Sequence, residues 1–346
     1  MKKLLTILCA LCLVFALAAC GGTQAPAESA APAESAAPAE SAAPAGSEAP
    51  ADAESYVVGV CQLVQHPALD AATEGFMAAL TDKLGDSVSF SVQNASGDSA
   101  TCAVIASQFV SDEVDLIMAN ATPALQAAVS ATNEIPILGT SVTDYGTALG
   151  IEDWTGVSGA NVSGTSDLAP LDGQAQILGE LFPEAKTIGI LYCSGEPNSK
   201  FQAETIKPML EALGCTVNEY TFADSNDVSA VTATACGECD VLYIPTDNTA
   251  ASCTEAINNV ALNAGVPIVC GEEGLCAGCG VATLSIDYYD LGYATGEMAY
   301  EILVNGADVS TMEVRFAPQF TKEYNAANCQ ALNITVPEDY TAIAAE

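Results

Sequence analysis

The chain has 346 residues, and its 44 Asp and Glu against 8 Lys and Arg give a formal net charge of −36. This charge excludes a nucleic-acid-binding protein, because Lys and Arg contacts to phosphates supply most of that affinity. Half of the residues are hydrophobic and only 15% are charged, so the chain can bury a large core. Its length predicts two lobes rather than one compact domain.

The N-terminus has the pattern of an export signal. Lys2 and Lys3 precede an uncharged apolar run over residues 4–19, which is too short for a membrane-spanning helix. The run ends in Leu-Ala-Ala-Cys, which resembles the bacterial lipobox, whose cysteine is acylated and becomes the mature N-terminus. We therefore expect a signal peptide over residues 1–19, lipidation of Cys20 and membrane anchoring on the extracytoplasmic face. The alternative is an ordinary signal peptide with an incidental cysteine.

A low-complexity segment follows the signal. Residues 25–42 repeat APAESA three times, and a similar composition continues to Ser55. Pro interrupts helices, Ala and Ser cannot build a core, and the repeated Glu residues repel one another. The composition predicts that residues 20–55 hold the lipidated cysteine and a disordered tether.

From residue 56 the chain alternates short apolar runs with segments of helical periodicity. Strands that are apolar on both faces and alternate with helices indicate a parallel sheet covered on both sides. The first series has strands at 56–64, 88–95, 115–121 and 136–142, with helices beginning near 67, 99 and 123. The second series has strands at 186–194, 216–223, 240–248 and 267–274, with helices over 197–213, 226–236 and 250–264.

The Gly-, Ser- and Thr-rich stretch over 143–167 is interpreted as a helix-free crossing between two lobes. The segment 281–287, a helix over 288–304 and an extended segment over 312–316 are expected to return to the first lobe, and a short tail to cross again. The predicted fold class is α/β, with two doubly wound parallel-sheet lobes joined by a hinge. The first lobe is expected to hold 56–160 and about 285–315, and the second 161–284 and the C-terminal tail.

Five segments resemble the ABC-transporter substrate-binding lipoproteins of the tryptophan/tyrosine type. They match in order and spacing over residues 56 to about 318: QLVQHPALDAATEGF (62–76), ANATPALQAA (119–128), GTSVTDYG (139–146), YIPTDNT (243–249) and IDYYDLGYATGEMA (286–299). The resemblance implies a type I, periplasmic-binding-protein-like fold that closes on a ligand. It also implies capture of a small solute, usually an aromatic amino acid, and delivery to the permease and ATPase subunits of an importer.

Polar residues gather where the predicted strands end. Ligands of open parallel sheets lie beyond these carboxyl ends, beside helix N-termini. The candidate ligand-binding residues are Gln65, His66, Thr122, Ser141, Thr143, Thr246, Asp247, Asn248, Glu273, Asp287 and Tyr288, and Ser194, Asn198 and Glu272 have similar positions.

An α-amino acid needs a site for its carboxylate and one for its ammonium group. No Lys or Arg falls at the strand ends, so hydroxyl groups beside helix N-termini are expected to bind the carboxylate, those of Thr122, Ser141 and Thr143. Asp247 and Asp287 are the first candidates for the ammonium, and Glu273 is the next. The alternative for both Asp residues is helix N-capping.

Aromatic and apolar side chains near the same ends are candidates for a side-chain pocket. They are Tyr145, His66, Tyr288, Tyr289 and Leu63, although His66 could equally be structural. Trp154, the only tryptophan, lies in the interlobe stretch and is expected to pack in the core or hinge.

Eleven cysteines follow Cys20, and an odd number cannot all form pairs with one another. Cys236 and Cys239, like Cys276 and Cys279, form a CxxC motif, for which a redox pair or a zinc site is possible. Cys61, Cys193 and Cys270 stand inside apolar strands, which favours buried free thiols. A disulfide is the next alternative, because exported proteins commonly form them.

Catalytic motifs are missing from the sequence, which has no GxSxG, Walker P-loop or HExxH segment and a single His. We therefore expect a protein that is not an enzyme and has no cofactor or metal. Two alternatives to an aromatic amino-acid carrier stay open. One is a binding protein for a sugar or a branched-chain amino acid, and the other is a ligand-sensing surface receptor.

Overall fold

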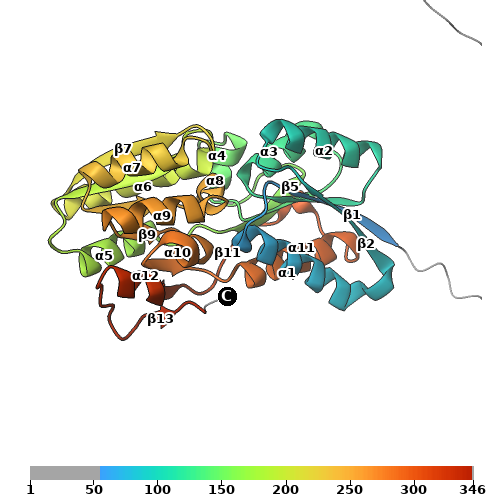
Figure 1. Cartoon of the computed structure of the whole chain (residues 1–346). Coiled ribbons are helices and arrows are strands. Elements are labelled where there is room, and N and C mark those ends of the chain that lie inside the picture. The colour runs from blue at the N-terminus through green and yellow to red at the C-terminus, as the bar shows by residue number, and fades with distance from the viewer. Residues whose placement is uncertain (1–54, 345–346) are drawn as a thin grey trace, which may run out of the picture. The chain divides into compact units, whose positions relative to one another are not determined.

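A computed structural model describes residues 55–344 (Figure 1). The signal peptide, the lipidation of Cys20 and nearly all of the tether fall outside the described residues. Within the described part, no helix combines the length and apolarity needed to cross a membrane.

The first sheet has six parallel strands in the order β11-β5-β4-β3-β1-β2. Alternate residues of the central strands β1, β3 and β4 are buried on opposite faces, and this explains the continuous apolar runs of these strands. Val58 and Val60 pack with α1 and α11, whereas Cys61 packs with α2 and α3. The elements are β1 (Tyr56–Gln62), α1 (Pro67–Leu84), β2 (Val88–Asn94), α2 (Ser99–Ser111), β3 (Leu116–Asn120), α3 (Thr122–Ala131), β4 (Ile137–Thr140), α4 (Tyr145–Leu149), β5 (Val162–Ser166), α11 (Tyr288–Leu303) and β11 (Arg315–Phe316).

The second sheet has seven strands in the order β13-β12-β10-β9-β8-β6-β7, and only β12 runs antiparallel to its neighbour β10. Helices α5 and α6 cover one face, and α7, α9 and α10 cover the other (Figure 1). The elements are α5 (Leu171–Leu181), β6 (Thr187–Cys193), α6 (Pro197–Ala212), β7 (Thr216–Phe222), α7 (Val228–Glu238), β8 (Val241–Ile244), α8 (Asn248–Ala251), α9 (Thr254–Ala264), β9 (Ile268–Cys270), α10 (Glu273–Cys279), β10 (Ala282–Ser285), β12 (Thr321–Tyr324), α12 (Ala326–Ala331) and β13 (Thr341–Ala342). The predicted α/β class with two doubly wound lobes is therefore confirmed.

The segments between the lobes differ from the prediction in two places. The stretch expected to be a helix-free crossing contains the short helix α4 and the strand β5, which pairs with β4 in the first sheet. The segment 281–287 was expected to lead back to the first lobe, but its strand β10 still pairs with β9 in the second sheet, which agrees with the expected assignment of 161–284 to the second lobe. We therefore propose a lobe boundary after Ser166, later than the expected boundary at residue 160. Three crossings, after β5, β10 and β11, then join the lobes.

The eleven cysteines of the described residues are unpaired, and most are buried. Cys61 and Cys270 have no exposed surface and Cys193 has little, as expected for small apolar side chains within strands. In each CxxC motif the two cysteines are about one helical turn apart. Cys236 lies in α7 and Cys239 is the C-cap of that helix, whereas Cys276 and Cys279 both lie in α10. That these thiols stay reduced in the exported protein is a prediction from the sequence.

Helices α1 and α11 pack with their backbones in close contact. A Cβ atom at Gly292 would collide with the main-chain oxygen of Ala72, and one at Gly75 with that of Tyr289. Because main-chain atoms cannot rotate away, the two glycines allow the close approach of these helices.

We predict that Gly292→Ala destabilises the protein by about 3 kcal/mol or more, because even one methyl group overpacks this contact. The matched control is Gly237→Ala on α7, where nothing lies within 4 Å of the new methyl group. Since Ala favours helix more than Gly by about 1 kcal/mol, the control should be neutral or slightly stabilised. Denaturant unfolding of both variants tests this, and equal stabilities would contradict the packing argument.

Candidate ligand-binding site

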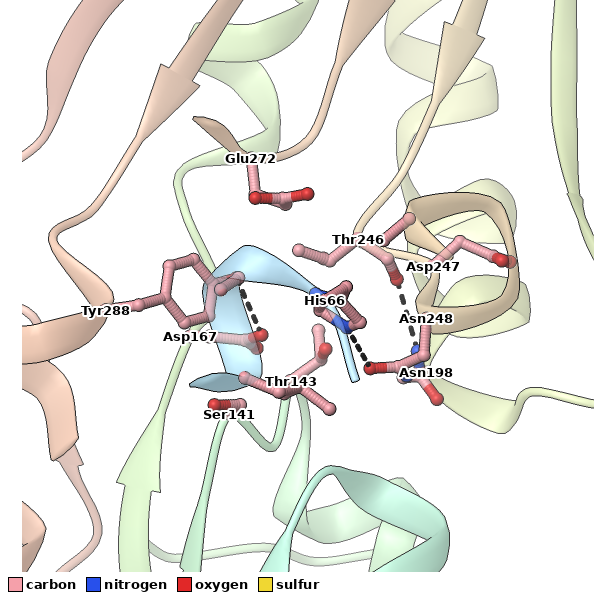
Figure 2. Close-up of a pocket in the computed structure, with 13 residues that line it drawn as sticks. His66, Ser141, Thr143, Asp167, Asn198, Thr246, Asp247, Asn248, Glu272 and Tyr288 are labelled. Carbon is pink, nitrogen blue, oxygen red and sulfur yellow. Dashed lines mark hydrogen bonds between the residues drawn. The ribbon is translucent and has the colours of Figure 1, made fainter. Parts of the chain in front are cut away.

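A cavity lies where the two lobes meet, at the carboxyl ends of the strands (Figure 2). The first lobe and the first crossing contribute residues at the start of α1 and after β4 and β5. The second lobe contributes residues at the starts of α6, α8 and α10. The lining consists of His66, Ala68, Leu69, Ser141, Thr143, Asp167, Asn198, Thr246, Asp247, Asn248, Ala251, Glu272 and Tyr288.

Seven of the eleven predicted site residues line this cavity. They are His66, Ser141, Thr143, Thr246, Asp247, Asn248 and Tyr288. Each follows a strand or flanks a helix N-terminus, which is the reasoning that predicted them.

The other four predicted residues lie elsewhere. Gln65 is exposed, and Thr122 is buried at the start of α3 without lining the cavity. Glu273 and Asp287 line a neighbouring groove of about 710 Å³. Tyr289 also faces this groove, and Glu272 and Tyr288 line both spaces.

The proposed side-chain pocket is also different from the prediction. Tyr145 and Leu63 are buried in the core of the first lobe and do not line the cavity. Tyr145 donates its hydroxyl to the oxygen of Thr165 over 3.1 Å. Trp154 stacks on the Tyr145 ring with centroids 6.0 Å apart, in agreement with a packing role.

Six lining residues are absent from the predicted set: the apolar Ala68, Leu69 and Ala251, and the polar Asp167, Asn198 and Glu272. Asn198 lies in the first turn of α6 and Glu272 is the N-cap of α10, so both have the strand-end positions that predict ligand contact. Asp167 directly follows β5, so recognising this strand would have identified it.

Asp247, the first candidate for binding an ammonium group, has both carboxylate oxygens occupied. Oδ1 accepts from the main-chain N–H of Ala250 at 2.8 Å, and Oδ2 accepts from that of Cys193 at 2.6 Å. Asp287 likewise caps α11 by accepting from the N–H of Asp290. Both residues therefore perform the N-capping that was the alternative.

Glu272 has the same arrangement at the start of α10. Its two oxygens accept from the main-chain N–H groups of Gly274 and Leu275. Burial raises its pKa to about 7, although these two hydrogen bonds favour the ionised form.

Asp167 is the exception among these carboxylates. It is 6% exposed, and its Oδ2 accepts the hydroxyl of Tyr288 at 3.0 Å. Its Oδ1 has no hydrogen-bond partner of normal geometry, although the Thr143 hydroxyl lies close enough to favour ionisation. Burial raises the pKa of Asp167 to about 6, that of Glu272 to about 7 and that of Asp247 to about 8. What distinguishes Asp167 from the other two is its unpaired oxygen Oδ1.

Unpaired polar atoms concentrate at the cavity. Within residues 55–344, seven buried side-chain atoms lack a hydrogen-bond partner, and four belong to cavity-lining residues: His66 Nδ1, Ser141 Oγ, Asp167 Oδ1 and Asn198 Oδ1. Since buried polar groups are nearly always paired in proteins, such a concentration indicates a place where a ligand supplies the partners.

The cavity is narrow and lacks positive charge. The centre of a water molecule can occupy only about 10 Å³ of it, which is roughly the room for one water. No Lys or Arg is among its lining residues. Across residues 55–344, no group of three or more His, Cys, Asp or Glu side chains is arranged to hold a metal ion.

Comparison with known proteins identifies relatives over most of the chain. The family model for ABC transporter substrate-binding proteins matches residues 57–346. A tyrosine-binding protein from Clostridioides difficile strain R20291 is 41% identical over 249 residues, which make up 71% of this chain and 72% of that protein.

Two solved structures are also similar. An ABC domain from Streptococcus pneumoniae in complex with L-Trp is 32% identical, with a TM-score of 0.79, covering 82% of this chain and 97% of the other. A ligand-free, open substrate-binding protein with adhesive properties from Clostridium difficile is 38% identical, with a TM-score of 0.64, covering 84% of this chain and all of the other. By family match, sequence identity and fold, the chain belongs to the ABC transporter substrate-binding proteins of the type I periplasmic-binding-protein fold.

Proposed function

We propose that this protein binds an aromatic amino acid in the cavity between its lobes and delivers it to the permease of an ABC importer. The observation that carries the proposal is the concentration of four unpaired buried polar atoms around one cavity between the lobes. A ligand with several hydrogen-bonding groups would satisfy them, and a free amino acid has both donors and acceptors.

The relatives support an aromatic ligand. The protein from Clostridioides difficile is described as tyrosine-binding, and the one from Streptococcus pneumoniae was solved with L-Trp. The Tyr288 ring lines both the cavity and the neighbouring groove, where it could contact an aromatic side chain.

Ligand entry requires the lobes to separate in this proposal, because the cavity holds about one water and an aromatic amino acid is far larger. The described lobes superpose better on the L-Trp complex than on the ligand-free, open relative, although identity to the open relative is higher. This difference supports a closed arrangement here and hinge opening as the entry step.

Asp167 is the proposed partner of the ligand ammonium group. Its free oxygen Oδ1 lines the cavity, whereas Asp247 uses both oxygens within the second lobe. An ammonium group beside Asp167 would also offset the cost of burying its charge.

Ser141 is the proposed contact of the ligand carboxylate. Its buried hydroxyl is unpaired, and its backbone has a φ of 52°, an uncommon value for a residue other than Gly. Strain of this kind costs about 1–3 kcal/mol and is frequent at ligand sites, where it aims a particular group. Of the other two hydroxyl groups expected to bind the carboxylate, those of Thr122 and Thr143, only Thr143 belongs to a residue that lines the cavity.

Two other functions stay as alternatives to the proposal. A sugar or a branched-chain amino acid could occupy the same cavity, and a surface receptor could bind its ligand without a permease. The unpaired atoms favour a ligand rich in hydrogen-bond donors, and the absence of catalytic motifs favours binding without chemistry.

We predict that Asp167→Asn weakens binding of the best ligand among L-Trp, L-Tyr and L-Phe by at least about 30-fold. This corresponds to about 2 kcal/mol, the lower end for removing one partner of a buried charge pair. The control is Asp172→Asn, which removes an exposed carboxylate five residues away. Titration calorimetry measures both variants.

Equal loss in both variants would contradict the role of Asp167. If the wild type binds a sugar or an aliphatic amino acid and none of the three aromatic ones, the proposed ligand class is wrong while the family assignment holds.

We also propose that Cys20 carries the lipid that anchors the protein to the extracytoplasmic face of the membrane. Acyl chains contribute about 0.8 kcal/mol per buried methylene, so losing them should release the chain. Cys20→Ser should leave the membrane fraction or accumulate unprocessed. Unchanged processing and membrane association of this variant would rule out the lipid anchor.

A further inference from the structure

Glu196 lies behind the cavity, at the N-cap of α6, and does not line it. Its side chain is buried, with 5% of the residue exposed, and both carboxylate oxygens accept hydrogen bonds. The donors are Asn198 Nδ2 at 3.2 Å, the main-chain N–H of Asn248 at 3.0 Å, Asn248 Nδ2 at 2.6 Å, the main-chain N–H of Thr249 at 2.8 Å and the Thr249 hydroxyl at 2.7 Å.

A carboxylate that only accepts fixes the orientation of the amides around it. Asn248 must turn its NH₂ group toward Glu196, so its Oδ1 points away, to His66 Nε2 at 3.3 Å (Figure 2). Asn198 must do the same, because its Nδ2 also faces the main-chain oxygen of Thr246 at 3.1 Å. The Oδ1 atom of Asn198 is left buried and unpaired at the cavity.

The orientation of Asn248 determines the tautomer of His66. Since Asn248 Oδ1 can only accept, His66 Nε2 must carry the hydrogen. Burial lowers the pKa of His66, which is 7% exposed, and so favours the neutral ring. His66 Nδ1 then has a free lone pair, and it is buried and unpaired.

Three atoms at the cavity are therefore acceptors only: His66 Nδ1, Asn198 Oδ1 and Asp167 Oδ1. Ser141 Oγ is the one unpaired lining atom that can also donate. A primary ammonium group has three N–H donors and no acceptor, so it complements such a set.

We propose that Glu196 is a positioning residue that keeps the cavity lined by acceptors and thereby selects ligands with a primary ammonium group. This inference rests on the proposed function, because it takes the cavity as the ligand site. It extends the ligand class to aromatic amines that lack the carboxylate. Ligands without the ammonium group leave buried acceptors unpaired, and sites built on such hydrogen bonds discriminate strongly.

Ligand selectivity is tested by titration calorimetry on the wild type. The probes are L-Tyr, tyramine, N-acetyl-L-tyrosine and 3-(4-hydroxyphenyl)propanoate, with the corresponding tryptophan series. The amino acid and its amine should bind, and the acetylated and deaminated compounds should bind at least about 100-fold more weakly. Comparable binding of the deaminated acid would overturn the selectivity.

The tautomer of His66 is tested independently of any ligand identity. His66 is the only histidine of the chain, so long-range ¹⁵N spectra of a preparation without a His tag report on this ring alone. The wild type should have the hydrogen on Nε2, with and without L-Tyr. A hydrogen on Nδ1 would overturn the proposal, and failure of all aromatic ligands to bind would instead reject the proposed function.

Glu196→Ala tests the positioning role, because a Gln side chain could keep its oxygen toward Asn248 and turn its NH₂ group to the Thr249 hydroxyl, which can accept. Without the carboxylate, no acceptor holds the Asn248 NH₂ group away from His66, so the His66 hydrogen should no longer be confined to Nε2. The discrimination between tyramine and the deaminated acid should then fall at least about tenfold. Glu211→Ala, an exposed change on the same helix, should alter neither property.

An unchanged tautomer and unchanged selectivity in a folded Glu196→Ala protein would remove Glu196 from this role. If that variant does not fold, the wild-type spectrum still decides the orientation on which the inference depends.

Discussion

The carboxylate of Asp167 is buried between the lobes without a cation beside it, and the account of the site depends on this arrangement. Burying a charge is costly unless partners replace its water. Asp247, Glu272 and Glu196 are also buried, but N–H and hydroxyl groups of the protein occupy their oxygens. Asp167 has only the Tyr288 hydroxyl and a nearby Thr143, so a positively charged ligand group adds most at this position.

The same constraint links the two lobes. Asp167 follows β5 at the first crossing between the lobes, and Tyr288, which donates to it, begins α11 at the second crossing, after β10. His66 from the first lobe meets Asn248 from the second. A ligand between these groups therefore completes hydrogen bonds to both lobes at once, which is how capture and closure are coupled in a hinged protein.

Much of the fold and part of the site follow from local patterns. Strands such as β1, β3 and β8 are apolar on both faces, and this continuous pattern predicts buried parallel strands without knowledge of their partners. The carboxyl ends of parallel strands share one edge of a sheet, so strand positions alone assign Ser141 to the ligand-binding edge of the first sheet and Asp247 to that of the second.

The strand β5 escaped prediction for a physical reason. Its sequence VSGTS is polar, but it is fully buried because its hydroxyl groups find partners in other elements. Thr165 lies within hydrogen-bonding distance of Thr140 and Thr295, and Ser163 donates to the oxygen of Met312. Such long-range pairing leaves no periodic hydrophobic signal, so the strand, the lobe boundary and Asp167 were missed together. Asp167 has an unpaired oxygen and Asp247 has none. This difference depends on tertiary contacts, so the sequence alone does not predict it.

The most direct test of the central claim is proton release on binding. With the pKa of Asp167 raised to about 6, a ligand ammonium that favours the ionised form should release up to roughly half a proton at pH 6 and almost none from this group at pH 8. Calorimetry of L-Tyr or L-Trp binding in buffers of different ionisation enthalpy measures this number. Glu272 and Asp247 also line the cavity with raised pKa values and contribute to the release in both proteins. The account therefore predicts that Asp167→Asn lowers the release at pH 6 by up to roughly half a proton. No release, or an equal release in the variant, would contradict it.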